Sequence, residues 1–110
     1  MRVPSAFIGK WRITHMEEWD QDFVDLVTEG HVTVRKDGTG EFQFGAVQGE
    51  IDGRIEDMGA GTVLGFTWEG SDELDPVCGR GWVRAAGEEM EGHLYFHRGM
   101  DSAFRARKVG

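Results

Sequence analysis

Residues 79–108 read GRGWVRAAGEEMEGHLYFHRGMDSAFRARK and carry the clearest structural signal in the chain. Within this stretch Gly92, Leu94 and Phe96 alternate with His93 and Tyr95. A period of two places the apolar side chains on one face of a strand and the polar side chains on the other. Two short turn segments divide the stretch into three such runs, at residues 79–86, 91–97 and 102–108. The stretch therefore predicts three consecutive antiparallel strands with one buried face.

The same alternation recurs through the rest of the chain. It is most regular over residues 47–56, where Val47, Ile51 and Ile55 alternate with polar and charged residues. Gly49 and Gly53 lie on the apolar face of that run, and we expect them either to let the strand coil sharply or to let aromatic rings pack against it. Further strands are expected at residues 7–14, 23–27, 31–36, 41–45 and 62–69.

About eight short strands joined by turns predict an all-β fold in a single domain, residues 1–110. Consecutive hairpins favour a small antiparallel up-and-down β-barrel, because closure removes exposed strand edges. A β-sandwich is the alternative. Met16, Trp19 and Phe23 have the spacing of one helical face, so a short helical turn is expected after the first strand. Residues 70–78 are expected to form the longest polar connection.

Composition limits the classes of function. The 110 residues carry a net charge of −8, which disfavours binding to a phosphate backbone. No run of about 18 apolar residues is present, so no membrane span is expected. Residues 1–5 lack the apolar core of a signal peptide, and Cys78 is the only cysteine. We expect a cytoplasmic protein without internal disulfides or cofactors.

Both ends of the chain resemble lipocalins and other calycins. Trp11 follows Gly9 in a G-x-W pattern, and Arg105 and Arg107 fall in the last predicted strand. The resemblance implies a calycin-like barrel in which the tryptophan closes one end and an arginine packs over it. Because the chain is shorter than a typical lipocalin, any cup inside it would be small or filled.

The chain also resembles an abundant family of small bacterial proteins of unassigned function. The matching segments are GKWRI at 9–13, MEEWDQDF at 16–23, FQFG at 42–45, WEGSDELD at 68–75, GRGW at 79–82 and HRGMDSAF at 97–104. Family members often read H-x-G-D-D-S-x-F at the last segment, where this chain has Met100 in place of an aspartate. No activity is established for the family, so the likeness implies none.

The aromatic side chains suggest a ligand site at a barrel mouth. The candidate contacts are Trp11, Trp68, Arg80, Trp82 and Arg84. Aromatic rings can line a ligand cup, but they can also fill a small barrel. Trp82, flanked by two arginines, could face inward at a mouth or form a surface cation–π stack. Inward-pointing arginines would anchor a carboxylate or phosphate. A non-enzymatic module that holds a small ligand is the first functional hypothesis.

The acidic residues suggest a second hypothesis, a protein-interaction module with a filled barrel. Asp20, Asp22, Asp72 and Glu73 are the candidates for an acidic face that docks a partner protein. Neither acidic segment matches an EF-hand loop, and solvated loop carboxylates explain both, so no metal site is expected. Self-association through exposed aromatic rings, giving a homo-oligomer, is also open.

A hydrolase is the third hypothesis. His97, Asp101 and Ser102 have the residue types of a hydrolytic triad, but they cluster at one predicted turn without a nucleophile motif. His93 and His97 stand four residues apart on one strand, which is about 13 Å and too far for one shared metal ion. No catalytic residue is assigned.

Overall fold

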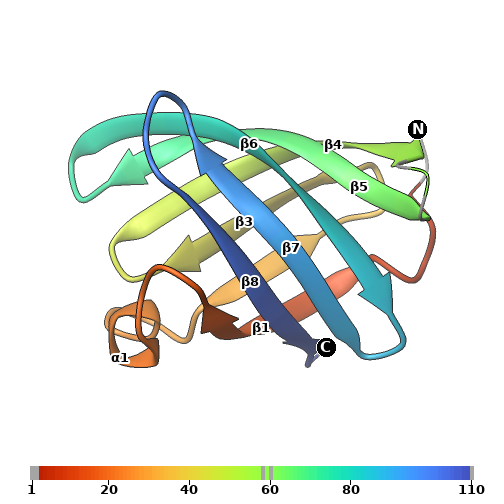
Figure 1. Ribbon diagram of the computed structural model, residues 1–110, viewed down its shortest axis with the longest axis horizontal. Helices are drawn as coiled ribbons and strands as arrows, with labels where there is room; N and C mark the ends of the chain where they lie inside the picture. The colour runs from red at the N-terminus through yellow and green to blue at the C-terminus, as the bar shows by residue number, and fades with distance from the viewer. Residues whose placement is uncertain (1–2, 58, 60, 110) are drawn as a thin grey trace.

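The computed structural model describes residues 3–57, 59 and 61–109, and these form one β-barrel. Its elements are β1 (Gly9–Met16), α1 (Gln21–Val24), β2 (His31–Val34), β3 (Thr39–Phe44), β4 (Val47–Asp57), β5 (Thr62–Asp72), β6 (Asp75–Ala86), β7 (Glu89–Phe96) and β8 (Asp101–Lys108). Each strand pairs antiparallel with the next in sequence, and β8 closes the barrel against β1 (Figure 1). The predicted eight-stranded up-and-down barrel is confirmed, and the sandwich alternative is excluded.

The helical turn after β1 is confirmed as α1, but the strand predicted at residues 23–27 is wrong. Asp20 caps the helix, because its carboxylate accepts the Phe23 N–H at 3.0 Å. The Val24 N–H donates to Asp20 O at 3.1 Å, so local hydrogen bonds use the groups that a strand would offer to a neighbour. No helix in the described part of the chain is long and apolar enough to cross a membrane.

The polar connection predicted at residues 70–78 is also wrong. The pairing of β5 with β6 continues to the end of the hairpin, where Asp72 lies opposite Asp75. Only Glu73 and Leu74 remain as a two-residue turn. A side chain on Gly70 would lie 1.8 Å from Gln48 O, so glycine is needed where the strands come close. The glycine and the polar residues of this segment suggested a loop, but they belong to the paired strands of the β5–β6 hairpin.

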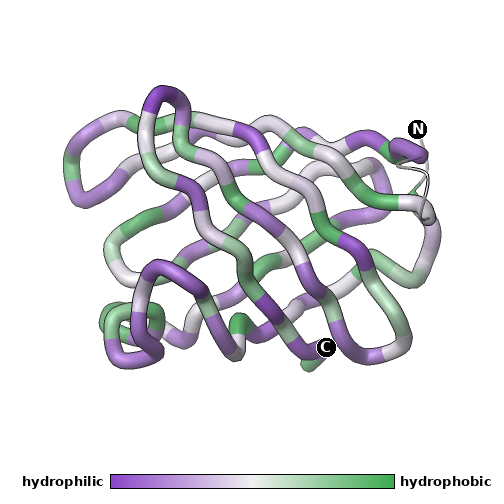
Figure 2. The backbone as a smooth tube through the Cα atoms, viewed as in Figure 1, coloured by the Kyte–Doolittle hydropathy of each residue, from purple (hydrophilic) through white to green (hydrophobic). Residues whose placement is uncertain are grey.

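The inward positions of the strands form a continuous core. Hydrophobic and hydrophilic residues alternate along most strands in Figure 2, and the buried residues come from the inward rows. The expectation for Gly49 is confirmed, because a Cβ there would lie 2.6 Å from the Phe42 ring and 2.9 Å from the Trp68 ring. Gly53 differs, because its nearest side chain is Leu64.

Both ends of the barrel are closed by side chains. At the end that carries α1, the Trp19 ring lies 4.9 Å from the Phe44 ring and 6.2 Å from the Phe96 ring. At the other end Phe7 is buried, and its carbonyl accepts the Trp11 indole N–H at 3.0 Å.

A lysine lies over Trp11, the tryptophan of the G-x-W pattern, at the end of the barrel opposite α1. The Lys108 ammonium lies 5.6 Å from the centre of the Trp11 ring. Arg105 and Arg107 are exposed on the outer face of β8, so the arginine expected over the tryptophan is not found there.

Candidate functional site

The interior of the barrel is filled. The central void measures about 10 Å³, and its walls are aromatic and aliphatic side chains such as Phe42, Phe66 and Phe104. One water molecule needs about 10–15 Å³ on the same measure, together with polar partners. The core therefore has no room for a ligand, and any binding chemistry lies on the outer surface.

The structure does not bring the five predicted ligand contacts together. Trp11 and Trp68 are buried, and their indole N–H groups donate to Phe7 O and Tyr95 O. Arg80, Trp82 and Arg84 lie on the outer face of β6, because Gly81 and Val83 take the inward positions. The Arg84 guanidinium lies 5.4 Å from the Trp82 ring, so the surface cation–π alternative is the one that forms.

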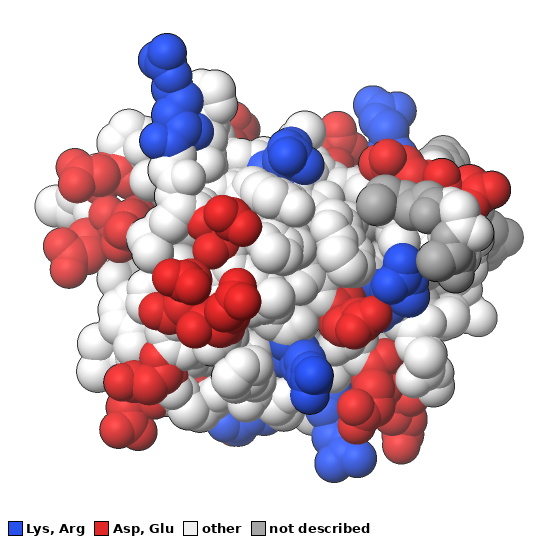
Figure 3. Space-filling model, viewed as in Figure 1, with Lys and Arg blue, Asp and Glu red and all other residues white. Residues whose placement is uncertain are grey.

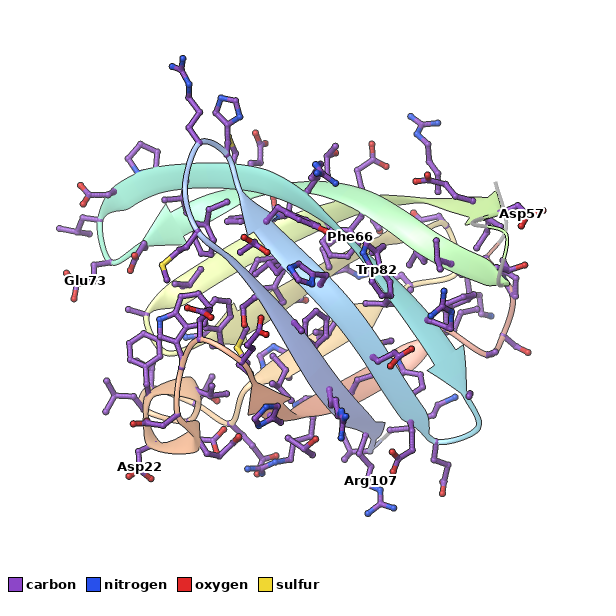
Figure 4. The ribbon with its side chains drawn as sticks, viewed as in Figure 1. Asp22, Asp57, Phe66, Glu73, Trp82 and Arg107 are labelled. Atoms are coloured by element: carbon purple, nitrogen blue, oxygen red, sulfur yellow. The ribbon has the colours of Figure 1, made fainter. Side chains whose placement is uncertain are left out.

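The four predicted acidic contacts do share one end of the barrel. Asp20 and Asp22 belong to the α1 region, and Asp72 and Glu73 form the end of the β5–β6 hairpin. Figure 4 shows Asp22 and Glu73 at the same end, with Asp57 at the opposite end. The β3–β4 turn joins these regions, since the Gly45 N–H donates to Val24 O and the Glu73 N–H donates to Ala46 O.

Negative charge is concentrated at this end. We call residues 17–30, 45–46, 72–75 and 97–101 the loop end. Its acidic residues are Glu17, Glu18, Asp20, Asp22, Asp25, Glu29, Asp72, Glu73, Asp75 and Asp101. These are ten of the chain's 20 carboxylates, whereas only Arg98 of the 12 basic side chains falls there. The loop end thus has nine more negative than positive charges, and the rest of the chain is close to neutral. Red side chains dominate the left of Figure 3, whereas red and blue mix at its right.

The loop end also exposes apolar side chains. Leu74 is 96% exposed at the tip of the β5–β6 hairpin, and Leu26, Val27 and Met100 are exposed on the adjacent loops. These are four of the five large hydrophobic residues that are exposed in the described part of the chain. Apolar tips within a charged rim are typical of an interaction surface.

A hydrogen-bond network holds the long loop of this end on β1. The Asp25 carboxylate accepts the Gly30 N–H at 2.9 Å, the Gln21 amide at 3.0 Å and the Arg12 guanidinium at 2.9 Å. The Gly30 hydrogen bond is the main cause that lowers the pKa of Asp25; partial burial opposes it, and Gln21 and Arg12 lower it further. Arg12 also pairs with Glu29. The loop is therefore positioned by the barrel wall.

Sequence reasoning missed a row of glutamates beside the loop end. Glu41, Glu50 and Glu69 lie directly opposite one another on β3, β4 and β5, along an outer groove of about 910 Å³. Like charges in cross-strand positions repel, and Arg35 pairs with Glu41 alone, at 3.0 Å. Each glutamate was visible as an outward residue, but their alignment depends on strand register. The row extends the acidic surface away from the loop end.

The hydrolase residues do not form a triad. His97 is exposed, and Asp101 pairs instead with His93, with 2.5 Å between Oδ2 and Nε2. Ser102 is buried; its hydroxyl accepts the Glu18 N–H and donates to Ala103 O. Within residues 3–57, 59 and 61–109, no group of three His, Cys, Asp or Glu side chains could hold a metal ion.

Comparisons with known proteins add no relative. No protein-family model matches the chain, and no curated protein or solved structure matches it significantly. The resemblances to calycins and to the small bacterial family therefore stay predictions.

Proposed function

We propose that this protein is an acidic interaction module that docks a partner protein with a basic surface through its loop end. The observation that carries the proposal is the separation of charge. One end of the barrel has an excess of nine negative charges, and the rest of the molecule is near neutral. A field of one sign on one face attracts a basic surface and orients it during encounter.

The exposed apolar side chains of the loop end provide the surface that a bound partner would bury. Exposed rim charges mainly set the association rate and its salt dependence, whereas buried apolar anchors give most of the affinity. Leu74 protrudes between acidic residues on both sides, Asp72 and Glu73 before it and Asp75 after it. A basic partner with an apolar pocket fits this arrangement.

The barrel supports docking by side chains rather than by strand addition. A closed barrel pairs every described strand on both sides, so a partner finds no edge to extend. Loops positioned on a rigid scaffold are a common location for binding residues. The filled core is consistent with a scaffold that presents its ends and outer face.

The test is affinity capture from the protein's own host by wild type and two variants. The loop-end variant carries Asp20→Asn, Asp22→Asn, Asp72→Asn and Glu73→Gln. The control variant loses four charges outside the loop end through Asp57→Asn, Glu88→Gln, Glu89→Gln and Glu91→Gln. Asparagine caps helices as well as aspartate does, so α1 is retained in the first variant.

We expect wild type and control to capture the same basic protein. The loop-end variant should bind that protein about tenfold more weakly, which corresponds to a loss of about 1.4 kcal/mol in binding free energy. Capture should weaken as salt rises from about 0.05 M to about 0.5 M, because exposed charges are then screened. Equal capture by the two variants, or a captured partner with an acidic surface, would contradict the proposal.

A further inference from the structure

A second hollow lies on the outer face of the barrel, separate from the loop end. It spans β4, β5, β6 and β7, measures about 460 Å³ and is within the size range of small-molecule sites. Its walls include Arg54, Glu56, Gly65, Arg80, Trp82 and Tyr95. Figure 4 shows Trp82 well away from Asp22 and Glu73, which mark the loop end.

Gly65 forms the floor of the hollow, where the Glu56 carboxylate covers it, and aromatic side chains form part of the walls. Gly65 lies between Arg54 on β4 and Trp82 on β6, so the outward row lacks a side chain at this position. The Tyr95 ring contacts the Arg80 guanidinium at 4.0 Å and stacks with the His93 ring at 4.6 Å. An aromatic ring that displaces the flexible end of Glu56 from Gly65 would lie beside Trp82, which stands directly opposite Gly65 on β6.

Two arginines of the hollow have no acidic partner. Among the described residues neither Arg54 nor Arg80 has a carboxylate within 4.0 Å, whereas four other arginines each form an ion pair. Thr67, whose side chain is also outward, stands directly opposite Arg80 on β5. Guanidinium groups beside a hydroxyl are suited to a phosphate.

Glu56 adds a hydrogen-bond acceptor to a hollow whose arginines are hydrogen-bond donors. A Cβ built on Gly65 would lie 1.8 Å from Glu56 Oε2, so this carboxylate reaches over the glycine floor. An ionised carboxylate only accepts hydrogen bonds. It therefore favours a ring that carries N–H donors over a ring that presents a carbonyl.

We propose that this hollow binds a nucleoside monophosphate whose base carries an exocyclic amine. The base displaces the Glu56 carboxylate from above Gly65, lies beside Trp82 and donates a hydrogen bond to that carboxylate. The phosphate binds Arg80 and Arg54. Asp52 lies opposite Thr67 on β4 and opposes the phosphate charge, which limits affinity. The site is independent of partner docking, because none of its residues belongs to the loop end.

The experiment titrates the full chain with adenosine 5′-monophosphate, followed by calorimetry and by the indole N–H signals in NMR. We expect saturable binding that shifts the Trp82 signal, while the hydrogen-bonded indoles of Trp11 and Trp68 serve as internal references. Adenosine alone and inorganic phosphate alone should each bind at least about tenfold more weakly, since each loses one set of contacts. Purine riboside 5′-monophosphate should also bind more weakly, because its base has no N–H donor for Glu56.

Variants assign the roles. Arg80→Gln should weaken binding at least about tenfold, and the matched control Arg105→Gln on β8 should not. Gly65→Thr should abolish binding without unfolding the barrel, because the atom in its way is the flexible end of Glu56. Asp52→Asn should tighten binding of the anion.

Three outcomes would overturn the proposal. They are the absence of saturable binding by adenosine 5′-monophosphate, phosphate alone binding as tightly as the nucleotide, and Asp52→Asn weakening the binding. The third outcome would mean that the hollow takes a cation.

Discussion

Asp25 connects local chemistry to the position of the loop end. Its carboxylate accepts hydrogen bonds from Gly30, Gln21 and Arg12, and these lower its pKa in the folded protein. A group whose pKa is lower in the folded than in the unfolded state stabilises the fold above the unfolded pKa, which is about 3.9. That contribution is lost as pH falls through the folded pKa.

Asp25→Asn should therefore lower the free energy of unfolding by about 1–2 kcal/mol at neutral pH, since hydrogen bonds to a charged group are weakened. The difference between wild type and variant should shrink below about pH 4, where the unfolded carboxyl is protonated. Urea unfolding between about pH 2 and pH 7 measures this difference. The pKa of Asp37 is also lowered, mainly by the Thr39 hydroxyl. Asp37 is present in both proteins, so its contribution cancels in the difference between their free energies of unfolding. A difference that does not vary with pH would contradict this account of Asp25.

Gly49 provides a second test at single-residue scale. Gly49→Ala should cost about 1–3 kcal/mol, because the added methyl group meets the Phe42 and Trp68 rings in a packed core. Gly65→Ala is the matched control on the outer face, where only the flexible Glu56 side chain must move, and we expect a change within about 0.5 kcal/mol. Thermal or urea unfolding compares the two. Equal costs would contradict the packing that we describe around Gly49.

The sequence predicts which face a residue takes more reliably than what the residue does there. Period-two alternation was sufficient to place Gly49 on the inward face, where aromatic packing was one of two predicted outcomes and is the one that the structure shows. It could not show that Trp11 and Trp68 are sealed inside, because a ring that lines a cup and a ring that fills a core give the same pattern. The interior volume distinguishes them, and it depends on how all the side chains pack.

The β5–β6 hairpin shows why the boundaries of elements were harder to predict. Gly70, Ser71 and Asp75 are typical of a loop by composition. In the barrel they belong to two paired strands. Gly70 is needed there because the β4 backbone at Gln48 comes too close to leave room for a side chain. The turn then falls on Glu73 and Leu74, and Glu73 has a φ of 58°.

The turns of the loop end give a matched pair of variants. Glu73 and Arg98 both adopt a left-handed backbone conformation, with φ of 58° and 57°. Glycine tolerates this conformation, so Glu73→Gly and Arg98→Gly should each raise the free energy of unfolding by up to about 1 kcal/mol.

The same two variants should have opposite effects on partner docking. Glu73→Gly removes a carboxylate from the loop end and should weaken capture, whereas Arg98→Gly removes its only basic side chain and should strengthen capture. Chemical denaturation together with partner capture measures both effects. Docking that changes in the same direction for both variants would mean that turn conformation, rather than charge, controls it.

At the scale of the whole molecule, the sequence predicts the amount of charge but not its location. The net charge of −8 is plain from composition, and Asp20, Asp22, Asp72 and Glu73 were predicted as candidates for one acidic face. Their shared location follows from the up-and-down topology, which returns the chain to the same end at every second turn. The glutamate row on β3, β4 and β5 needs strand register, which alternation alone does not supply.

A filled barrel also predicts a negative result. Retinol or a long-chain fatty acid should show no saturable binding, because the central void of about 10 Å³ admits neither. Titration followed by tryptophan fluorescence checks this. Saturable binding that is lost on enlarging a core residue, such as Leu94→Phe, would contradict a filled interior.

The most direct measurement of the central claim, docking through the loop end, is site-specific photo-cross-linking in the host. A benzophenone amino acid replaces Leu74, which is 96% exposed at the hairpin tip, or Glu88, which is exposed at the opposite end of the barrel. We predict that light produces a covalent adduct with a basic protein from position 74 and none from position 88. No adduct from position 74, or equal adducts from both positions, would contradict the account.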